Sequence, residues 1–161
     1  MKRFVYLSFA CFFFAAFFAS EVRADVKLPA IFSDHMVLQQ RSQVAVWGWA
    51  KPNATVSVTG SWDKKTYSAK SDASGYWRLK IATPAAGFTP YTLTISDGKA
   101  VTLSNILIGE VWVCSGQSNM EMPMKGFRNE PIEGGPEAIA MSTNPGIRCF
   151  TVTKASKAAR F

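Results

Sequence analysis

Histidine and cysteine are scarce in this sequence: of its 161 residues, one is histidine and three are cysteine. A zinc site needs three or four closely spaced His, Cys or carboxylate ligands, and no such group is present, so we predict no metal and no other cofactor. A glycine-rich phosphate-binding loop is also missing, because Gly134-Gly135 lies in a proline-containing connection. The net charge is +7, but the basic residues are scattered and are not interleaved with aromatics on one face. A nucleic-acid partner is therefore not expected.

Long apolar runs are absent except at the start of the chain. Basic Met1-Lys2-Arg3 precedes an apolar run from Phe4 to Ala19, and Val22-Arg23-Ala24 places small residues at a cleavage position. The run is shorter than the roughly 20 residues of a spanning helix, which disfavours the alternative of an uncleaved membrane anchor. We predict a signal peptide over residues 1–24. Its removal would take away three basic residues and one acidic residue, leave a charge of +5, and place the protein in the periplasm or outside the cell, or in the secretory or lysosomal route of a eukaryote.

Two cysteines, Cys114 and Cys149, remain after that cleavage. An exported protein could join them in a disulfide, and their spacing leaves open whether they meet. Cysteine is also a common small core residue. We expect two buried thiols.

The region from Lys27 to about Ser104 has the pattern of short β-strands. Apolar and polar residues alternate with a period of two, which sends successive side chains to opposite faces. Turn residues separate the segments, and Asp97-Gly98 is a strong hairpin signal. No convincing helical period occurs. The pattern predicts an all-β sandwich of immunoglobulin or jelly-roll type over residues 25–105, built from the segments 44–49, 55–59, 77–81 and 91–95.

Aromatic residues are frequent in this β region. They could stack on sugar rings and make the region a carbohydrate-binding module, but aromatics in a sandwich more often pack in the core or between domains. We expect Trp77, which shares a face with Leu79 and Ile81, to be buried. The residues concerned are Trp47, Trp49, Trp62, Tyr67, Tyr76 and Trp77.

The pattern changes near Asn105. "ILIGEVWVC" is apolar on both faces, as in a parallel strand covered on both sides by helices. A connection and a second apolar run, "IRCFTV", follow. Strand, connection, strand is how an α/β domain begins, and a two-stranded sheet cannot cover both of its faces. We therefore expect residues 106–161 to be the incomplete beginning of an α/β domain, and the chain to be truncated.

Ser118 lies just after the apolar run Val111 to Val113, in the stretch "SGQSN". A serine nucleophile needs a base, an exposed position and donors for the oxyanion. A strand that ends in a turn made by Gly116, Gln117 and Asn119 would supply the exposed position at the carboxyl edge of a sheet. The alternative is that Ser118 caps a helix, with Glu121 completing a capping box.

Several stretches resemble the sialate O-acetylesterase family, a branch of the SGNH (GDSL-like) hydrolases. "GEVWVCSGQSNMEMPM" is similar to its nucleophile block, and the other stretches follow in the family's order: "LPAIFSDHMVLQQ", "VAVWGWA", "SDASGYWRLKI" and "NPGIRCFTV". The resemblance implies a flavodoxin-like SGNH domain after the β domain. It makes Ser118 the nucleophile, with its backbone N–H as one oxyanion donor, and O-acetylated sugars or glycans the substrates.

The sequence departs from the family pattern in one respect. The histidine base, its acidic partner and the further oxyanion donors belong to later blocks that do not occur before Phe161. Loss of one triad member costs orders of magnitude in rate, so we expect little esterase activity from this chain alone. His35, in "FSDHMVLQQ", is expected to have a structural or inter-domain role and no catalytic one. The alternative function is a secreted, non-catalytic β-sandwich that binds sugars or a partner protein; the oligomeric state is left open.

Overall fold

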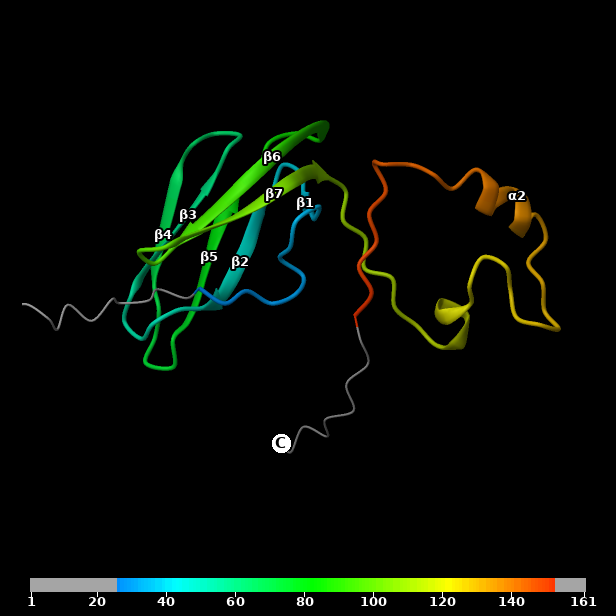
Figure 1. Ribbon diagram of the computed structural model, residues 1–161, viewed down its shortest axis with the longest axis horizontal. Helices are drawn as coiled ribbons and strands as arrows, with labels where there is room; N and C mark the ends of the chain where they lie inside the picture. The colour runs from blue at the N-terminus through cyan, green and yellow to red at the C-terminus, as the bar shows by residue number, and fades with distance from the viewer. Residues whose placement is uncertain (1–25, 153–161) are drawn as a thin grey trace, which may run out of the picture.

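β-strands dominate the computed structural model, which describes residues 26–152. The predicted signal peptide, residues 1–24, therefore lies outside the described residues. The strands and two short helices follow one another as β1 (Val37–Gln39), β2 (Gln43–Trp49), β3 (Thr55–Gly60), β4 (Thr66–Lys70), β5 (Tyr76–Ala82), β6 (Gly87–Ser96), β7 (Ala100–Gly109), η1 (Ser118–Glu121) and α2 (Gly135–Ala140). All strands precede Glu110, and both helices follow it (Figure 1).

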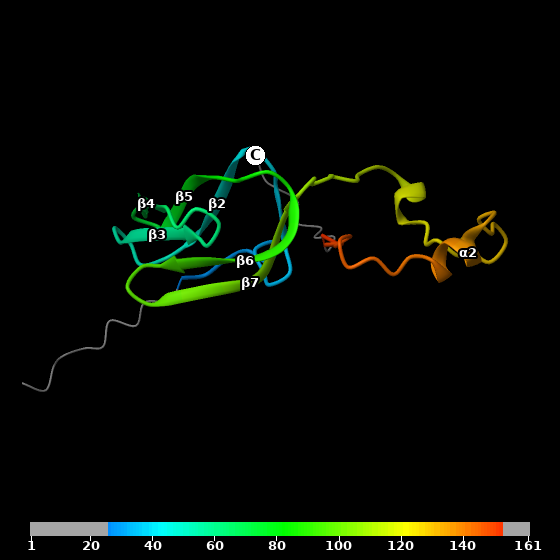
Figure 2. The same ribbon diagram turned by 90° about the horizontal axis from the view of Figure 1, so that it is seen from above.

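The strands form two sheets. One has five strands in the order β1-β7-β6-β3-β4, and the other pairs β2 with β5. In Figure 2 the β2 and β5 ribbons lie on one side of this region and β6 and β7 on the other. Pairing is antiparallel except between β1 and β7, which run parallel from Val37 opposite Leu107 to Gln39 opposite Gly109. The mostly β architecture is confirmed, and its finer assignment to the immunoglobulin or jelly-roll type stays a prediction.

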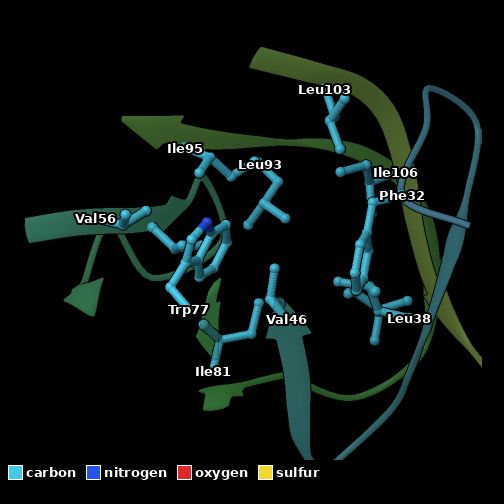
Figure 3. Packing of buried hydrophobic residues seen from close by; sticks show 12 residues of the cluster. Phe32, Leu38, Val46, Val56, Trp77, Ile81, Leu93, Ile95, Leu103 and Ile106 are labelled. Atoms are coloured by element: carbon cyan, nitrogen blue, oxygen red, sulfur yellow. The ribbon is translucent and has the colours of Figure 1, made fainter. Parts of the chain in front are cut away.

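The hydrophobic core lies between the two sheets. Its side chains come from β2 and β5 on one side and mainly from β3, β6 and β7 on the other. In Figure 3, Val46, Ile81 and Leu93 lie around the Trp77 indole, whereas Phe32 and Leu38 lie at the other end of the cluster. The members with 0% exposure are Val46, Val56, Val58, Ile81, Leu93, Ile95 and Ile106. Each belongs to a segment whose alternation was read from the sequence, apart from Ile106. Burial of such side chains stabilises the fold by about 1.5–3 kcal/mol each.

The aromatic residues mostly take packing roles. Trp77 is 1% exposed, as expected. Trp47 is half-buried and meets Phe32 edge to face, with ring centroids 4.7 Å apart. Trp49 is the exception, at 43% exposure beside Tyr76 at the end of the β2–β5 pair. The core reading therefore accounts for these aromatics better than the sugar-stacking one.

Side-chain hydrogen bonds join the two sheets where the chain crosses between them. Trp62 Nε1 donates to the Ala82 carbonyl at 2.9 Å, and the Ala82 N–H donates to the Tyr67 hydroxyl at 3.2 Å. The connection from β4 to β5 contains buried Ser71, whose hydroxyl accepts from Ala54 N at 2.9 Å and donates to the Lys51 carbonyl. These contacts satisfy backbone groups that no strand ladder reaches.

β7 ends earlier than the sequence suggests. The apolar pattern predicts a strand from Ile106 to Cys114, but β7 stops at Gly109, and no strand forms among residues 110–152. The physical reason is the loss of neighbours: β1 ends at Gln39, opposite Gly109, and Gly87 at the start of β6 lies opposite Ile108. Residues 106–108 are buried on both faces, as predicted, but they belong to the sheet of the β domain, and no helix covers them.

Residues 110–152, which we call the arm, extend away from the sheets and then return to them (Figure 1). η1 and α2 are their only helices, and the expected strand over "IRCFTV" is not formed: Ile147 and Val152 are 68% and 76% exposed. Within residues 26–152, no helix has the length and apolar content needed to cross a membrane.

Candidate active site

Ser118 is the first residue of η1, a single 3₁₀ turn near the beginning of the arm. The residues from Val111 to Met120 are all exposed, so the Ser118 side chain is open to solvent. The first N–H groups of a helix have no partner inside it, which applies to the backbone N–H of Ser118. The serine thus has the exposure that a nucleophile needs, on an irregular turn and not at the edge of a sheet.

The predicted turn residues shape this segment. Met120 N donates to the Gln117 carbonyl at 2.9 Å, and Met122 N donates to the Asn119 carbonyl at 3.3 Å. A Cβ at Gly116 would lie 2.6 Å from Met120 Cγ, so a larger residue there would require the exposed Met120 side chain to move. The helix-capping alternative for Ser118 is not what the structure contains, because Gln117 is the N-cap and makes no side-chain capping bond.

The surroundings of Ser118 correct two expectations. Trp112 and Val113 are 82% and 91% exposed, so the apolar run before the serine is not an interior strand. Cys114 and Cys149 are both free and exposed, and the expectation of buried thiols is wrong. Both errors have one cause: apolar character predicts burial only where neighbouring elements supply a cover, and among residues 26–152 nothing packs over this part of the arm.

The base of the arm is fixed by a carboxylate. Glu110 accepts hydrogen bonds from Gln39 Nε2 at 2.9 Å and from Gln40 Nε2 at 2.6 Å, and Gln39 Oε1 accepts from Val111 N at 2.8 Å. The bond from Gln39, followed by that from Gln40, lowers the pKa of Glu110, while desolvation opposes the change. These contacts tie the first residues of the arm to Gln39, the last residue of β1, and to Gln40, which follows it.

His35 is engaged away from Ser118. Its Nδ1 lies 2.7 Å from Asn105 Nδ2, and its carbonyl accepts from Arg148 Nη1 at 2.9 Å. Its backbone is left-handed, with φ of 66°. These contacts join the β domain to the end of the arm, which agrees with the structural role expected for His35.

Sequence reasoning missed the residues that hold the arm, namely Glu110 and Arg148 with their partners. One signal was available, because asparagine is enriched at left-handed positions and Asn105 has φ of 54°. Among residues 26–152, no group of three or more His, Cys, Asp or Glu side chains could hold a metal ion.

The chain is similar to curated sialate O-acetylesterases. No family model matches the chain. It is 28% identical over 144 residues to the sialate O-acetylesterase of Mus musculus, covering 79% of this chain and 24% of the relative. It is 30% identical over 117 residues to the sialate O-acetylesterase of Homo sapiens, covering 66% and 22%. The chain therefore spans about a quarter of the length of these curated relatives.

A solved structure is also similar. It is a carbohydrate acetylesterase from Xanthomonas citri, with a TM-score of 0.63 and 36% sequence identity, over 74% of this chain and 26% of that one. Sequence and structure comparisons point to the same kind of protein that the motifs around Ser118 resemble. These matches confirm that the chain is related to the sialate O-acetylesterase family.

Proposed function

We propose that this chain supplies the serine nucleophile of a carbohydrate O-acetylesterase, with Ser118 in that role. The observation that carries the proposal is the exposed position of Ser118 at the start of η1, inside the stretch that resembles the nucleophile block of the family. The names of the relatives support the substrate class, which is O-acetylated sugars or glycans. The turn residues Gly116, Gln117 and Asn119 shape the backbone around the serine.

The reaction is an acyl transfer in two steps. Ser118 Oγ forms a bond to the acetyl carbonyl carbon, the bond from that carbon to the sugar oxygen breaks, and the proton of Oγ passes through a base to the sugar. Water then attacks the acetyl carbonyl carbon, the bond from that carbon to Ser118 Oγ breaks, and acetate is released as a proton of the water passes through the base to Oγ. The Ser118 N–H serves as one donor to the oxyanion. The proposal assigns no base to this chain, because the histidine base of the family belongs to a later block and, within residues 26–152, His35 has no hydrogen bond to Ser118.

Two finer statements belong to the same proposal. The arm begins an SGNH-type α/β domain, whose further elements would cover the exposed apolar residues of the arm, such as Trp112 and Val113. The protein is exported, with residues 1–24 as its signal peptide. Both rest on the sequence patterns and on the family resemblance.

The test uses a chimaera. Residues 26–152 replace the matching region of the Xanthomonas citri carbohydrate acetylesterase, and acetate release from an acetylated sugar is measured for the chimaera and for its Ser118→Ala and Ser115→Ala variants. Ser115 is another exposed serine, three residues earlier, which makes it the matched control. We expect Ser118→Ala to lose several orders of magnitude in rate and Ser115→Ala to retain the rate of the parent.

Equal rates for the Ser118→Ala variant and its parent would overturn the assignment of the nucleophile. The alternative function, a non-catalytic sugar-binding β domain, has one structural feature in its favour: the partly exposed Trp49 beside Tyr76. Binding of glycans by the chain that is lost on Trp49→Ala, with no dependence of turnover on Ser118, would favour that alternative.

A further inference from the structure

Arg148 lies near the end of the arm and makes a concentrated set of contacts with the β domain. Its Nη1 donates to the carbonyls of His35 at 2.9 Å, Met36 at 3.4 Å and Asn105. Its Nη2 donates to Asn105 Oδ1 at 3.0 Å. A guanidinium presents several donors in a fixed plane, and its hydrogen bonds are stronger than those between neutral groups. The half-buried Arg148 side chain therefore donates hydrogen bonds to three backbone carbonyls and to one side-chain amide oxygen.

The sheet makes these acceptors available through a bulge. Leu93 on β6 lies opposite Leu103, whereas Tyr91 lies opposite Ile106, so β7 contains one extra residue between these pairs. A bulge leaves backbone groups outside the ladder, and Asn105, with its left-handed φ of 54°, lies within it. The carbonyl of Asn105 is thereby free to accept from Arg148.

The turn that carries His35 is itself held on the bulged strand. His35 N donates to the Ser104 carbonyl at 3.0 Å, and Ser104 N donates to Asp34 Oδ1 at 2.6 Å. The turn that contains the His35 and Met36 carbonyls is therefore held on the sheet by hydrogen bonds that do not involve Arg148. A preorganised set of acceptors gives a single docking geometry, because little remains to be ordered on contact.

The Asn105 amide links Arg148 to the imidazole. Because Oδ1 accepts from Arg148, Nδ2 is directed to His35 Nδ1, 2.7 Å away. An amide nitrogen only donates, so Nδ1 must be the acceptor, and the neutral ring carries its proton on Nε2. Arg148 thus fixes the amide, and the amide fixes the ring.

Both ends of the arm are therefore attached to the β domain. Glu110 and Val111 are held by glutamine side chains at the beginning, and Arg148 is held at the end. A further contact supports the second attachment: a Cβ at Gly146 would lie 2.7 Å from Phe88 Cε1, so the glycine backbone lies directly against that ring. Ser118 is located between the two attachments.

We propose that Arg148 is a positioning residue for Ser118: by docking on His35, Met36 and Asn105, it closes the arm and fixes the orientation of the serine turn relative to the sheets. This inference rests on the proposed role of Ser118. Without Arg148, the end of the arm loses its hydrogen bonds to the β domain and keeps the contact of Gly146 with Phe88, so the serine turn samples more orientations. Positioning of this kind affects the rate, because small displacements of a nucleophile are costly.

The first test measures orientation without catalysis. A spin label on Cys114 reports on the arm, and a second label on Ser68→Cys, at an exposed position of β4, reports on the sheet; Cys11 and Cys149 are replaced by serine. Pulsed electron paramagnetic resonance then gives the distance distribution for the full chain with Arg148, for Arg148→Ala and Arg148→Lys, and for Arg128→Ala as the control. Arg128 is an exposed arginine of the arm without a hydrogen bond to any of residues 26–152.

We expect one narrow distance for the parent and for Arg128→Ala, loss of that narrow distance in Arg148→Ala, and partial recovery in Arg148→Lys. The same distribution in Arg148→Ala and in the parent would overturn the proposal. Near-ultraviolet circular dichroism of the core tryptophan reports whether each variant is folded, and Arg148→Lys provides the comparison if the alanine variant is not.

The second test uses the chimaera described above. Arg148→Ala should lower kcat by roughly tenfold or more, about 1.4 kcal/mol, with partial rescue by Arg148→Lys and the parent rate in Arg128→Ala. An unchanged kcat in Arg148→Ala would contradict positioning. Because the spectroscopic test needs no turnover, failure of the Ser118 proposal and failure of the Arg148 proposal give different results.

Discussion

Ile81 offers a quantitative test of the core that the two sheets share. This core stabilises the β domain to which the arm is attached. The Ile81 side chain is fully buried near one end of the β2–β5 pair, opposite Val44. Truncation to valine removes one buried methyl group and should cost about 1 kcal/mol, and truncation to alanine leaves a cavity and should cost about 3 kcal/mol. In a domain of under 100 residues, each kcal/mol lowers Tm by about 4–8 °C. We therefore expect Tm to fall by about 4–8 °C for Ile81→Val and by about 12–24 °C for Ile81→Ala.

Thermal unfolding followed by circular dichroism measures both shifts. Lys80→Ala is the matched control, because Lys80 is the preceding residue of β5 and points to solvent on the opposite face. Its effect should stay within about 0.5 kcal/mol. If Ile81→Ala shifted Tm no more than Lys80→Ala, the two sheets would not share the core described above, and the β2–β5 pair would be held mainly by its hydrogen bonds to the five-stranded sheet.

Three further predictions concern other parts of the chain. Ser71→Ala should lower the free energy of unfolding by about 1 kcal/mol, because it removes the hydrogen bonds of a buried hydroxyl to Ala54 N and the Lys51 carbonyl, which keep a 3.2 Å bond to each other. Ser68→Ala, at an exposed strand position, should have little effect, and denaturant unfolding compares the two. The lowered pKa of Glu110 means that its contribution to stability is present above the ordinary glutamate pKa of about 4.3 and is lost as the pH falls through the lowered value in the folded state. The difference in Tm between the parent and Glu110→Gln should therefore shrink in acid, and a constant difference from pH 7 to 3 would contradict this. Cys114 and Cys149 should both react with a thiol reagent in the folded chain at the rate of exposed thiols, and a requirement for denaturant would show that they are covered.

The β domain was largely predictable because its signal is local. Alternation with a period of two assigned Trp77 and Ile81 to one face and Arg78 to the other, and the structure agrees. The hairpin at Asp97-Gly98 was found from two residues, and it joins β6 to β7. In these strands the alternation of neighbouring residues decides which side chains are buried, so the sequence pattern alone was sufficient to predict the buried face.

The arm and its attachments were less predictable, because they depend on distant partners. Val113 reads as a strand residue, yet β7 ends at Gly109, where its neighbours end. Arg148 has no sequence signature, since its acceptors arise from a bulge and a turn more than 40 residues away. Ser118 was identified through the resemblance to the family's nucleophile block, because neither periodicity nor composition indicates which serine is a nucleophile.

The parallel β1 strand has a consequence for self-association. Exposed edges of a sheet can recruit a strand from another molecule. Here β1 offers only three residues, Val37 to Gln39, before the chain turns away. At the opposite edge, β4 has five residues, three of them exposed, and ends in Lys70. One edge strand is short and the other ends in a lysine, so neither edge readily pairs with a strand of another molecule. Aggregation through the edges of the five-stranded sheet is therefore disfavoured.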